Sequence, residues 1–468
     1  MGEEKGSYDL VVIGGGPGGY TAAVRARQLG LKVALVERET LGGVCLNWGC
    51  IPTKALLRQA EVWNLIGRGA EFGFSVHDAQ FDWKKVIARS RETADQLAAG
   101  VAHLMKKNGV EVVAGSGRIT PLRQVEVRDE RGDVESVLSS EHILIATGST
   151  PRSLPGIEID GQRVMSSRHA MVLEALPADM LIVGAGAIGV EFAYFFNAFG
   201  SRVTLVESLP QILPREDEEA AQALRHQLEK QGISVATEAR VVSVEADGKR
   251  VAVRYTIAGQ EHTASVDRVL MAVGVQSQSA GLGLEALGVR TRDGMIEVNA
   301  QQQTSVRGIW AIGDVAGPPQ LAHMAAAEGI AAVEFMAGRS RPAIDRTQVP
   351  NCIYSQPQVA SVGLSEADAR ARGVDVKVGR FPFAASGKAR AAGESEGFVK
   401  LVFGAQYGEL LGGVIVGSEA TELVGELALA LKLEATYEEL LYTIHAHPTF
   451  AEAIMEAAGQ AFGESINI

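Results

Sequence analysis

Cysteine is scarce in this chain of 468 residues, which contains only three cysteines. A secreted scaffold stapled by disulfides needs many more, so the sequence excludes that class of protein. Positive charge is also in deficit, because 44 Lys and Arg face 56 Asp and Glu and leave a formal net charge of −12. An acidic balance argues against binding to nucleic acid or to an anionic membrane through net charge.

The first residues lack the marks of a targeting segment. Met1–Ser7 has neither an apolar signal core nor an Arg-rich amphipathic pattern. The most lipid-like stretch, Met180–Ser201, is long enough to span a bilayer, but Glu191 interrupts it and it is rich in glycine. A buried strand followed by a helix explains that stretch better. We therefore expect a cytoplasmic protein with no membrane partner and no nucleic-acid partner.

Glycine, by contrast, is abundant, with 53 residues and no collagen-like period. Much of it belongs to an internal repeat, in which Tyr8–Glu37 and Ala178–Glu207 share one pattern. Each copy has a short apolar run, a glycine turn, a segment with helical spacing, and a second apolar run that ends in glutamate. Apolar runs that alternate with helices indicate a parallel sheet buried on both faces. The sequence therefore predicts an α/β fold with two Rossmann-like units.

The rest of the chain predicts further elements around these two units. From about residue 346 the pattern changes to strands followed by helices, which indicates a separate α+β domain. Elsewhere we expect helices over 83–108 and 323–337, buried strands over 142–148, 268–274 and 309–314, and small β layers over 110–137 and 233–267.

The first glycine turn has the spacing G-x-G-x-x-G, formed by Gly14, Gly16 and Gly19. The first glycine permits the turn, the second lets a pyrophosphate approach the backbone, and the third lets helix and strand pack closely. The helix N-terminus then offers N–H groups and the positive end of its dipole to the phosphates. Glu37 closes the next strand, where an acid can bind ribose hydroxyls. A glycine triplet alone also fits a plain tight turn, but the full pattern favours a dinucleotide site.

The second turn repeats this spacing with Gly184, Gly186 and Gly189. Two such sites imply two dinucleotides. Glu207 closes the second strand, and a carboxylate there suits a free 2′-hydroxyl and repels a 2′-phosphate, which favours NAD over NADP. Glu191, just inside the helix, is either an exposed helical acid or a polar contact of the cofactor, and its spacing leaves both interpretations open.

Two of the three cysteines, Cys45 and Cys50, are separated by four residues in a glycine-flanked stretch directly after the first unit. Glycines help the backbone bring two sulfurs to bonding distance, and a labile disulfide beside a cofactor is a redox group. The alternatives are two buried thiols or a metal pair, although no second Cys/His cluster of suitable spacing accompanies them. Lys54 is either a surface lysine or a group that stabilises electron-rich forms of the cofactor.

Near the C-terminus stands the segment His445-Ala446-His447-Pro448, with Glu452 four residues after the proline. A histidine oriented by a carboxylate is a general base of suitable pKa for deprotonating a thiol. Either histidine can equally be structural. The third cysteine, Cys352, has no partner in sequence and is interpreted as a small buried residue.

Taken together, these residues resemble those of the pyridine nucleotide–disulfide oxidoreductases, and within that family the dihydrolipoamide dehydrogenases. The resemblance runs from Asp9 to Asn467, and its most specific parts are the stretches GGVCLNWGCIPTK and HAHPTFAEA. It implies an FAD-binding domain, an NAD-binding domain, a central domain that completes the FAD site, and a C-terminal dimerisation domain. The corresponding residues are 1–150, 151–275, 276–345 and 346–468.

The same resemblance implies roles for individual residues. Cys45 resembles the thiol that exchanges with substrate, and Cys50 the thiol beside the flavin. His447 resembles the active-site base, which acts from the other subunit of a homodimer, and Glu452 its orienting acid, with His445 in support. No metal is expected. The resemblance implies FAD at Gly14, Gly16, Gly19, Glu37, Lys54, Gly117, Thr147, Gly148, Ser149, Asp314, Leu321, Ala322 and His323, and NAD at Gly184, Gly186, Gly189, Glu191, Glu207, Val241 and Gly274.

The activity so implied is the flavin-dependent oxidation of protein-bound dihydrolipoamide to lipoamide, with reduction of NAD+ to NADH. The implied partner is the lipoyl-bearing acyltransferase of a 2-oxo-acid dehydrogenase complex or a glycine-cleavage carrier protein. An NAD(P)H-dependent disulfide or metal-ion reductase is the alternative within the family, and a flavoprotein that only binds is the alternative outside it. The chain departs from many relatives at Val275–Ser279, where an Arg and a Pro-Asn are usual, which puts the NAD contacts and domain packing there in doubt.

Overall fold

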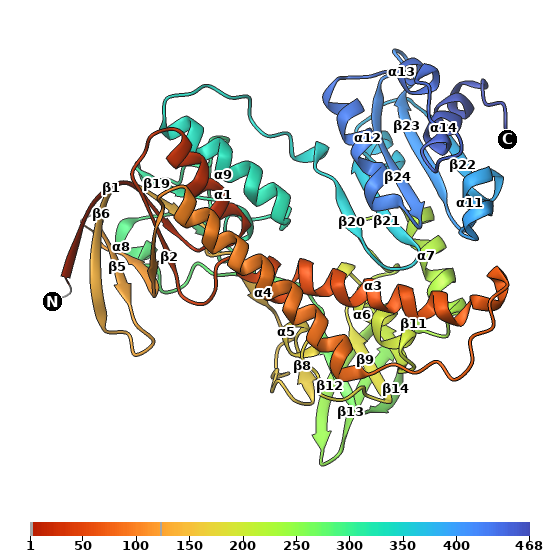
Figure 1. Ribbon diagram of the computed structural model, residues 1–468, viewed down its shortest axis with the longest axis horizontal. Helices are drawn as coiled ribbons and strands as arrows, with labels where there is room; N and C mark the ends of the chain where they lie inside the picture. The colour runs from red at the N-terminus through yellow and green to blue at the C-terminus, as the bar shows by residue number, and fades with distance from the viewer. Residues whose placement is uncertain (1–2, 122–123) are drawn as a thin grey trace. The chain divides into compact units, whose positions relative to one another are not determined.

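The computed structural model describes residues 3–121 and 124–468 (Figure 1). The contacts within the chain divide it into two compact units, and each unit is assembled from three separate segments. The helix α3, Cys50–Gly67, begins in the first unit and continues into the second. The first unit comprises Met1–Ala55, Lys84–Arg152 and Gly274–Ile344, and the second comprises Leu56–Trp83, Ser153–Val273 and Asp345–Ile468.

The first unit contains a seven-stranded sheet in the order β3-β2-β1-β6-β5-β4, with β19 also paired to β6. The pairs β1–β2, β2–β3, β1–β6 and β6–β19 are parallel, whereas β4, β5 and β6 pair antiparallel. The predicted parallel sheet and the small β layer are therefore joined into one sheet. The strands are β1 Glu3–Ile13, β2 Val33–Glu37, β3 Glu111–Ala114, β4 Ser116–Ile119, β5 Gln124–Arg128, β6 Val134–Ile145 and β19 Ile309–Ala311.

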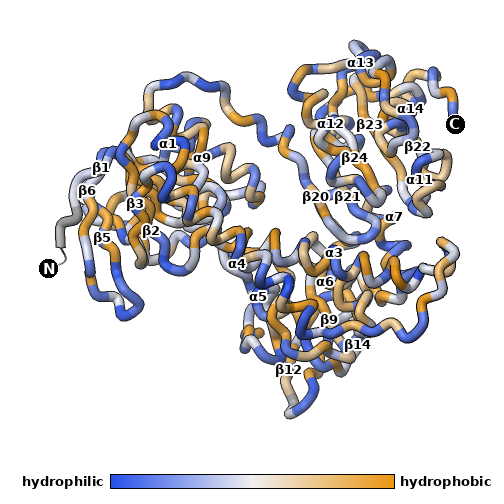
Figure 2. Tube along the Cα trace, viewed as in Figure 1, coloured by the Kyte–Doolittle hydropathy of each residue, from blue (hydrophilic) through white to orange (hydrophobic). Residues whose placement is uncertain are grey.

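Two helices, α1 (Pro17–Gln28) and α9 (Ala322–Met336), pack against each other in the first unit (Figure 1). Small residues allow the close approach, since a Cβ at Gly329 would lie 2.7 Å from the carbonyl oxygen of Gly18. The apolar strand residues are buried on both faces of the sheet, one face against these helices. Figure 2 shows hydrophobic residues concentrated along the central strands, as the continuous apolar runs predict.

The second unit contains a fully parallel five-stranded sheet in the order β11-β10-β9-β15-β8. The stretch Met180–Ser201, which has the length of a membrane span, instead forms most of β9 and the helix α6. Three aromatic side chains of α6 and the following turn, Phe195, Phe196 and Phe199, pack against Trp83, which explains why this helix is largely apolar. The elements are β8 Val164–Met165, β9 Asp179–Val183, α6 Ala187–Ala198, β10 Arg202–Val206, α7 Glu218–Lys230, β11 Ser234–Ala236 and β15 Arg268–Met271.

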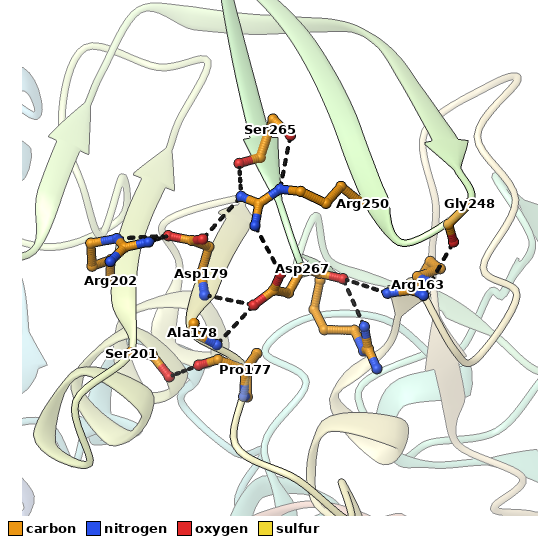
Figure 3. Close-up of polar contacts among 11 residues, drawn as sticks. Arg163, Pro177, Ala178, Asp179, Ser201, Arg202, Gly248, Arg250, Ser265 and Asp267 are labelled. Atoms are coloured by element: carbon orange, nitrogen blue, oxygen red, sulfur yellow. Dashed lines mark hydrogen bonds and ion pairs between the residues drawn. The ribbon is translucent and has the colours of Figure 1, made fainter.

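An antiparallel sheet of β12 (Ala239–Asp247), β13 (Arg250–Ile257) and β14 (Gln260–Val266) follows β11, within the small β layer predicted over 233–267. A charged network ties β13 to the parallel strands (Figure 3). Asp179 accepts hydrogen bonds from Arg202 at 2.8 Å and from Arg250 at 2.9 Å. Burial by itself would raise the pKa of Asp179, but these two guanidinium groups outweigh it and lower the pKa.

The C-terminal part of the second unit is an antiparallel five-stranded sheet in the order β20-β21-β24-β23-β22, covered by helices, as the predicted α+β pattern requires. The buried Lys400 of β23 contacts Asp217 of α7 at 3.0 Å and so joins this sheet to the preceding helix. The elements are β20 Asn351–Ile353, β21 Gln358–Gly363, α10 Glu366–Ala371, β22 Val376–Pro382, α11 Gly387–Ala392, β23 Phe398–Gly404, β24 Leu410–Gly417, α12 Ala420–Lys432, α13 Tyr437–Tyr442 and α14 Glu452–Phe462.

Helix α4, Trp83–Lys107, begins where the sequence predicts and ends one residue early. Among the longer helices, α3 and α7 were not predicted, and neither were several helices of four to six residues. Within residues 3–121 and 124–468, no helix is long and apolar enough to cross a membrane.

Candidate active site

The first glycine turn has the geometry that its spacing predicts. Gly14 adopts φ +108°, and a Cβ there would collide with the carbonyl oxygen of Ala146, while a Cβ on Gly19 would collide with that of Gly14. These two glycines are required by the fold itself. Gly16 differs, because its Cβ would meet nothing closer than the Cα of Gly43 at 3.9 Å. Packing does not require a glycine at 16, which is what a backbone left open to a pyrophosphate predicts.

The second turn reproduces this arrangement. Gly184 has φ +99° and faces the carbonyl of Ala272, and Gly189 faces that of Gly184, whereas a Cβ on Gly186 would meet nothing within 4 Å. In both units the middle glycine is also the N-cap of the helix and provides no side-chain cap. The first turns of α1 and α6 contain no acidic residue. Both helix N-termini therefore suit the phosphates of a dinucleotide.

The acid that closes each unit is held by backbone N–H groups. Glu37 accepts hydrogen bonds from Gly15 at 2.7 Å and from Glu39 at 2.8 Å. Glu207, which is buried, accepts from Ala185 at 2.8 Å and from Leu209 at 2.9 Å. Each carboxylate is thus fixed beside its glycine turn, where the sequence predicts contact with a ribose. The residues present fit two dinucleotides.

Asp314 lies in a short 3-10 helix, Gly313–Val315, and accepts a hydrogen bond from the hydroxyl of Ser149 at 2.5 Å. Burial raises the pKa of Asp314, and the bond from Ser149 opposes that rise. The buried Glu328 of α9 holds the same segment, because its carboxylate accepts the N–H of Gly313 at 2.7 Å. Sequence reasoning missed Glu328, whose only signal is an acid in the middle of an apolar helix.

The segment Val275–Ser279 departs from the usual family residues, yet it is well anchored in the first unit. β16 (Val275–Ser277) pairs with β7 (Ser149–Pro151). Ser277 donates to the carbonyl of Asp314 at 2.7 Å, and Gln278 donates to that of Ser149 at 3.1 Å. Gln278 also accepts a hydrogen bond from Arg38. These contacts tie the segment to residues expected at the FAD site.

The two cysteines lie on two consecutive helices. Cys45 is in α2 (Gly43–Trp48), and Cys50 is the first residue of α3. Gly49 breaks the helical path between them with φ −148° and ψ −115°, and a Cβ there would lie 3.0 Å from the carbonyl oxygen of Val44. We call Gly42–Cys50 the redox loop. Its bend brings the Cys45 and Cys50 side chains within hydrogen-bond distance, in the thiol form.

The hydrogen bond with the Cys50 thiol is the main cause that raises the pKa of Cys45, followed by burial. Lys54, one turn further along α3, acts in the opposite direction through its charge. Cys50 stands at the positive end of the 18-residue helix α3, a position that favours a thiolate. The two sulfurs therefore have unequal environments, which suits one exchanging thiol and one retained thiolate.

The redox loop lies against the first glycine turn. Gly42 donates its N–H to the carbonyl of Gly15 at 2.8 Å. Gly43 adopts φ +57°, and a Cβ there would lie only 2.6 Å from the Cα of Gly16. The loop thus touches the residue that the first dinucleotide is expected to approach. The loop that carries the cysteines therefore packs on the first glycine turn, and the placement of the sulfurs at a cofactor stays a prediction.

The predicted histidine pair is resolved into two different settings. The Nδ1 atom of His447 lies 2.8 Å from the carboxylate of Glu452, and this histidine is 77% exposed. Glu452 also accepts the N–H of Thr449 at 2.8 Å. Burial alone would raise the pKa of Glu452, but Thr449 and His447 outweigh it and lower the pKa. Glu452 therefore stays ionised and orients an accessible ring.

His445, by contrast, is engaged at both ring nitrogens. Nε2 lies 2.8 Å from Glu426, and Nδ1 lies 2.9 Å from the carbonyl of Thr443. Both partners accept hydrogen bonds, so both nitrogens must carry protons. The hydrogen bond with Glu426 raises the pKa of His445. Both ring nitrogens of His445 are therefore occupied, unlike the exposed ring of His447, which suits the supporting role that the family resemblance implies.

The remaining predicted positions fall in both units. Glu191 is 3% exposed and accepts the N–H of Tyr354 at 3.0 Å, so the interpretation as an exposed helical acid is wrong. Gly274 lies in the first unit, where its carbonyl accepts the N–H of Arg152, and is not grouped with Glu207. The first unit also contains Gly117, Thr147, Gly148, Leu321, Ala322 and His323, and the second contains Val241.

Among the described residues, no group of three or more His, Cys, Asp or Glu side chains has an arrangement that could hold a metal ion. The two cysteines also lack further ligands of suitable type in the sequence around them. The interpretation of Cys45 and Cys50 as a metal pair therefore gains no support.

Comparisons with known proteins agree with this arrangement. Residues 8–329 match the family model described as pyridine nucleotide-disulphide oxidoreductase. Residues 349–458 match the model of that family's dimerisation domain. The chain is 46% identical to a dihydrolipoyl dehydrogenase of Rhizobium etli, covering 98% of this chain and 99% of the relative. It is 48% identical to one of Chlorobaculum tepidum, covering 97% of each chain.

Solved structures give the same answer. LpdA from Mycobacterium tuberculosis superposes with a TM-score of 0.90 at 29% identity, covering 96% of this chain and 98% of that one. The HOCl-induced flavoprotein disulfide reductase RclA from Escherichia coli superposes with a TM-score of 0.85 at 28% identity, covering 97% and 99%. With two fixed dinucleotide turns and a cysteine pair against the first of them, the chain belongs to the pyridine nucleotide-disulphide oxidoreductase family.

Proposed function

We propose that this protein is a dihydrolipoyl dehydrogenase, which oxidises a protein-bound dihydrolipoyl group and reduces NAD+. The observation that carries the proposal is the pair of neighbouring thiols, Cys45 and Cys50, in a loop packed on the first glycine turn. The relatives named dihydrolipoyl dehydrogenase cover nearly the whole chain and give the substrate class. FAD and NAD are its cofactors.

FAD, when bound, supplies the electron acceptor for the reduced cysteines, and NAD+ carries the electrons away as hydride. We assign FAD to the first turn, with Glu37, Lys54 and Asp314, and NAD to the second turn, with Glu207. The buried carboxylate of Glu207 favours a dinucleotide without a 2′-phosphate. The division into domains at 1–150, 151–275, 276–345 and 346–468 remains part of the proposal.

The chemistry of the chain itself is thiol–disulfide exchange. One thiol of the substrate loses its proton to the imidazole of His447, and the resulting thiolate attacks the sulfur of Cys45. In the oxidised enzyme the Cys45–Cys50 disulfide breaks, and Cys50 leaves as a thiolate at the N-terminus of α3. The second substrate thiol then attacks the substrate sulfur of the mixed disulfide and releases Cys45. Glu452 orients His447 and stabilises the imidazolium.

We further propose that His447 serves the cysteines of a second copy of the chain. The dimerisation-domain match at residues 349–458 supports a homodimer. We also propose that the partner is a lipoyl-bearing protein, either an acyltransferase of a 2-oxo-acid dehydrogenase complex or a glycine-cleavage carrier protein, and that the enzyme works in the cytoplasm. The low cysteine content suits a reducing compartment.

Turnover of free dihydrolipoamide with NAD+ tests the activity. C45S and C50S are expected to lose turnover by several orders of magnitude, because each removes one sulfur of the exchange. C352S is the matched control, because Cys352 lies in β20 and not in the redox loop. This variant is expected to keep wild-type turnover. Wild-type protein that is inert to dihydrolipoamide would overturn the proposal. A clear preference for NADPH over NADH would instead favour the reductase alternative.

Mixed dimers test the arrangement across subunits. Co-expression of C45S and H447Q chains rebuilds one intact site in each heterodimer if the histidine acts on the other subunit. Random assembly then restores about a quarter of wild-type turnover, because half of the dimers are mixed and each has one working site. If the histidine served its own chain, no assembly of these two variants would contain a complete site, and turnover would stay absent.

A further inference from the structure

Helix α4 places an arginine, Arg91, against the part of the redox loop that lies between Cys45 and Cys50. Arg91 donates from Nη1 to the carbonyl oxygen of Asn47 at 2.6 Å. Its guanidinium carbon lies 4.2 Å from the centroid of the Trp48 ring. Asn47 and Trp48 are the last two residues of α2, directly before the bend at Gly49. One side chain therefore contacts both the backbone and the ring at the C-terminal end of that helix.

The C-terminal end of α2 favours a positively charged hydrogen-bond donor. The last carbonyls of a helix have no partner within the helix, and α2 ends at a sharp bend where continuation into α3 is blocked. A cation at a helix C-terminus interacts favourably with the dipole. A planar guanidinium can donate a hydrogen bond and lie over an indole at the same time, which an ammonium does less well.

Hydrogen bonds within the loop and to α3 transmit the contact with Arg91 to the rest of the loop. The buried amide of Asn47 donates to Leu41 at 3.1 Å and to Gly43 at 2.9 Å, so it ties the end of α2 to the start of the redox loop. Thr53 donates to the carbonyl of Gly49 at 2.6 Å and ties the bend to α3. The loop thus behaves as one piece, and Arg91 connects that piece to a different helix.

We propose that Arg91 is a positioning residue for the redox loop. By fixing Asn47 and Trp48 from α4, Arg91 holds Cys45 and Cys50 at exchange distance. The inference rests on the proposed role of the two cysteines, but it concerns the loop geometry and not the identity of the substrate. Arg91 contacts Asn47 and Trp48, and we place its effect in the loop backbone that carries the two cysteines.

The test measures alkylation of Cys45 in the reduced FAD-containing enzyme, by iodoacetamide with peptide mass spectrometry, across a range of pH. R91M keeps an apolar stem and loses both the donor and the charge. We expect Cys45 to be alkylated about tenfold faster and kcat with dihydrolipoamide to fall about tenfold, with little change in KM. R91K keeps the positive charge but loses the planar guanidinium. Its alkylation rate and its kcat are expected to lie between those of R91M and wild type.

R89M is the matched control, because Arg89 is exposed on the same helix two residues away. It is expected to match wild type in alkylation rate, pH profile and kcat. W48L removes the ring that Arg91 covers and should reproduce part of the R91M effect, namely faster alkylation of Cys45 and a lower kcat. If R91M does not fold, W48L and R91K together test the proposal. Wild-type alkylation rates and kcat in folded R91M, R91K and W48L would overturn the proposal. If wild-type enzyme fails to oxidise dihydrolipoamide, the proposed function fails, while the alkylation contrast still tests Arg91.

Discussion

The two dinucleotide units share one backbone design and differ in the loop that leaves the second strand. In each, a glutamate accepts the N–H of the residue after the first glycine, Gly15 or Ala185. The loop after each unit donates an N–H back to that same residue at 2.8 Å, from Gly42 in the first and from Leu213 in the second. The first loop then continues into the cysteines, whereas the second continues into α7. The two turns therefore share one backbone design, and the loop laid on the first of them carries the cysteine pair.

The neighbours also decide which residue each turn tolerates. A Cβ at Gly15 would lie 2.9 Å from the end of the Leu41 side chain and 3.0 Å from the Glu37 carboxylate, so alanine there would require these side chains to shift, whereas the second turn accommodates Ala185. The first turn is crowded by Leu41, which directly precedes the redox loop, and by the acid that closes the unit. The first turn is therefore more crowded than the second, on the side where the chain leads into the redox loop.

The largest effect should come from the third glycine of each turn. G19A and G189A each drive a methyl group into the carbonyl of the first glycine, so we expect about 3 kcal/mol or more of lost unfolding free energy. Denaturant unfolding measures it. If the two units are independent in this respect, G19A should lose bound FAD, while G189A should keep the flavin colour and lose NADH binding. Wild-type stability in either variant would contradict the steric argument.

The middle glycine should separate binding from folding. G16A and G186A place the new methyl in open space, so unfolding free energy should change by no more than about 1 kcal/mol. Each should weaken its own dinucleotide about tenfold or more, because the methyl occupies the approach to the phosphates. Flavin release measures the first and NADH titration the second. A large loss of stability with unchanged affinity would show that packing and not the ligand requires these glycines.

The two acids should have separable effects on the two cofactors. E207Q keeps the size of the side chain and removes its charge. We expect this variant to bind NADH about tenfold more weakly, and the ratio of its affinities for NADH and NADPH to become smaller. E37Q should leave NADH binding unchanged and weaken FAD instead. Titration of both nucleotides against both variants checks this. Equal losses for NADH and NADPH in E207Q would point to a structural effect on the turn.

The last expected effect is a pH dependence of stability that Asp179 contributes to the second unit. The pKa of Asp179 is lowered by Arg250 and Arg202, so its contribution to stability is present above the unfolded-state pKa of about 3.9 and is lost as pH falls through the lower folded pKa. D179N should cost about 1–3 kcal/mol near neutral pH and flatten the fall in stability between about pH 5 and pH 2. Urea unfolding at several pH values tests it. An unchanged slope in D179N would assign the acid sensitivity elsewhere.

Several features of this protein follow from its sequence alone. The glycine spacing, the apolar runs and the terminal glutamates depend on local backbone geometry and on burial of both sheet faces, so the repeat at Tyr8–Glu37 and Ala178–Glu207 predicts both turns. The spacing of Cys45 and Cys50 predicts two sulfurs able to meet, because that distance is set within one short stretch of chain. Local rules reach this far because every group involved is close in sequence.

The tertiary structure decided what lies close together from distant parts of the chain. Whether Glu191 is exposed depends on β20, more than 150 residues later, whose neighbour Tyr354 covers it. The anchoring of Val275–Ser279 by Ser149 and Asp314, and the contact of Arg91 with the redox loop, likewise join segments that no periodicity connects. Long-range packing determines these contacts, since burial and hydrogen bonding there depend on which surfaces the whole chain brings together.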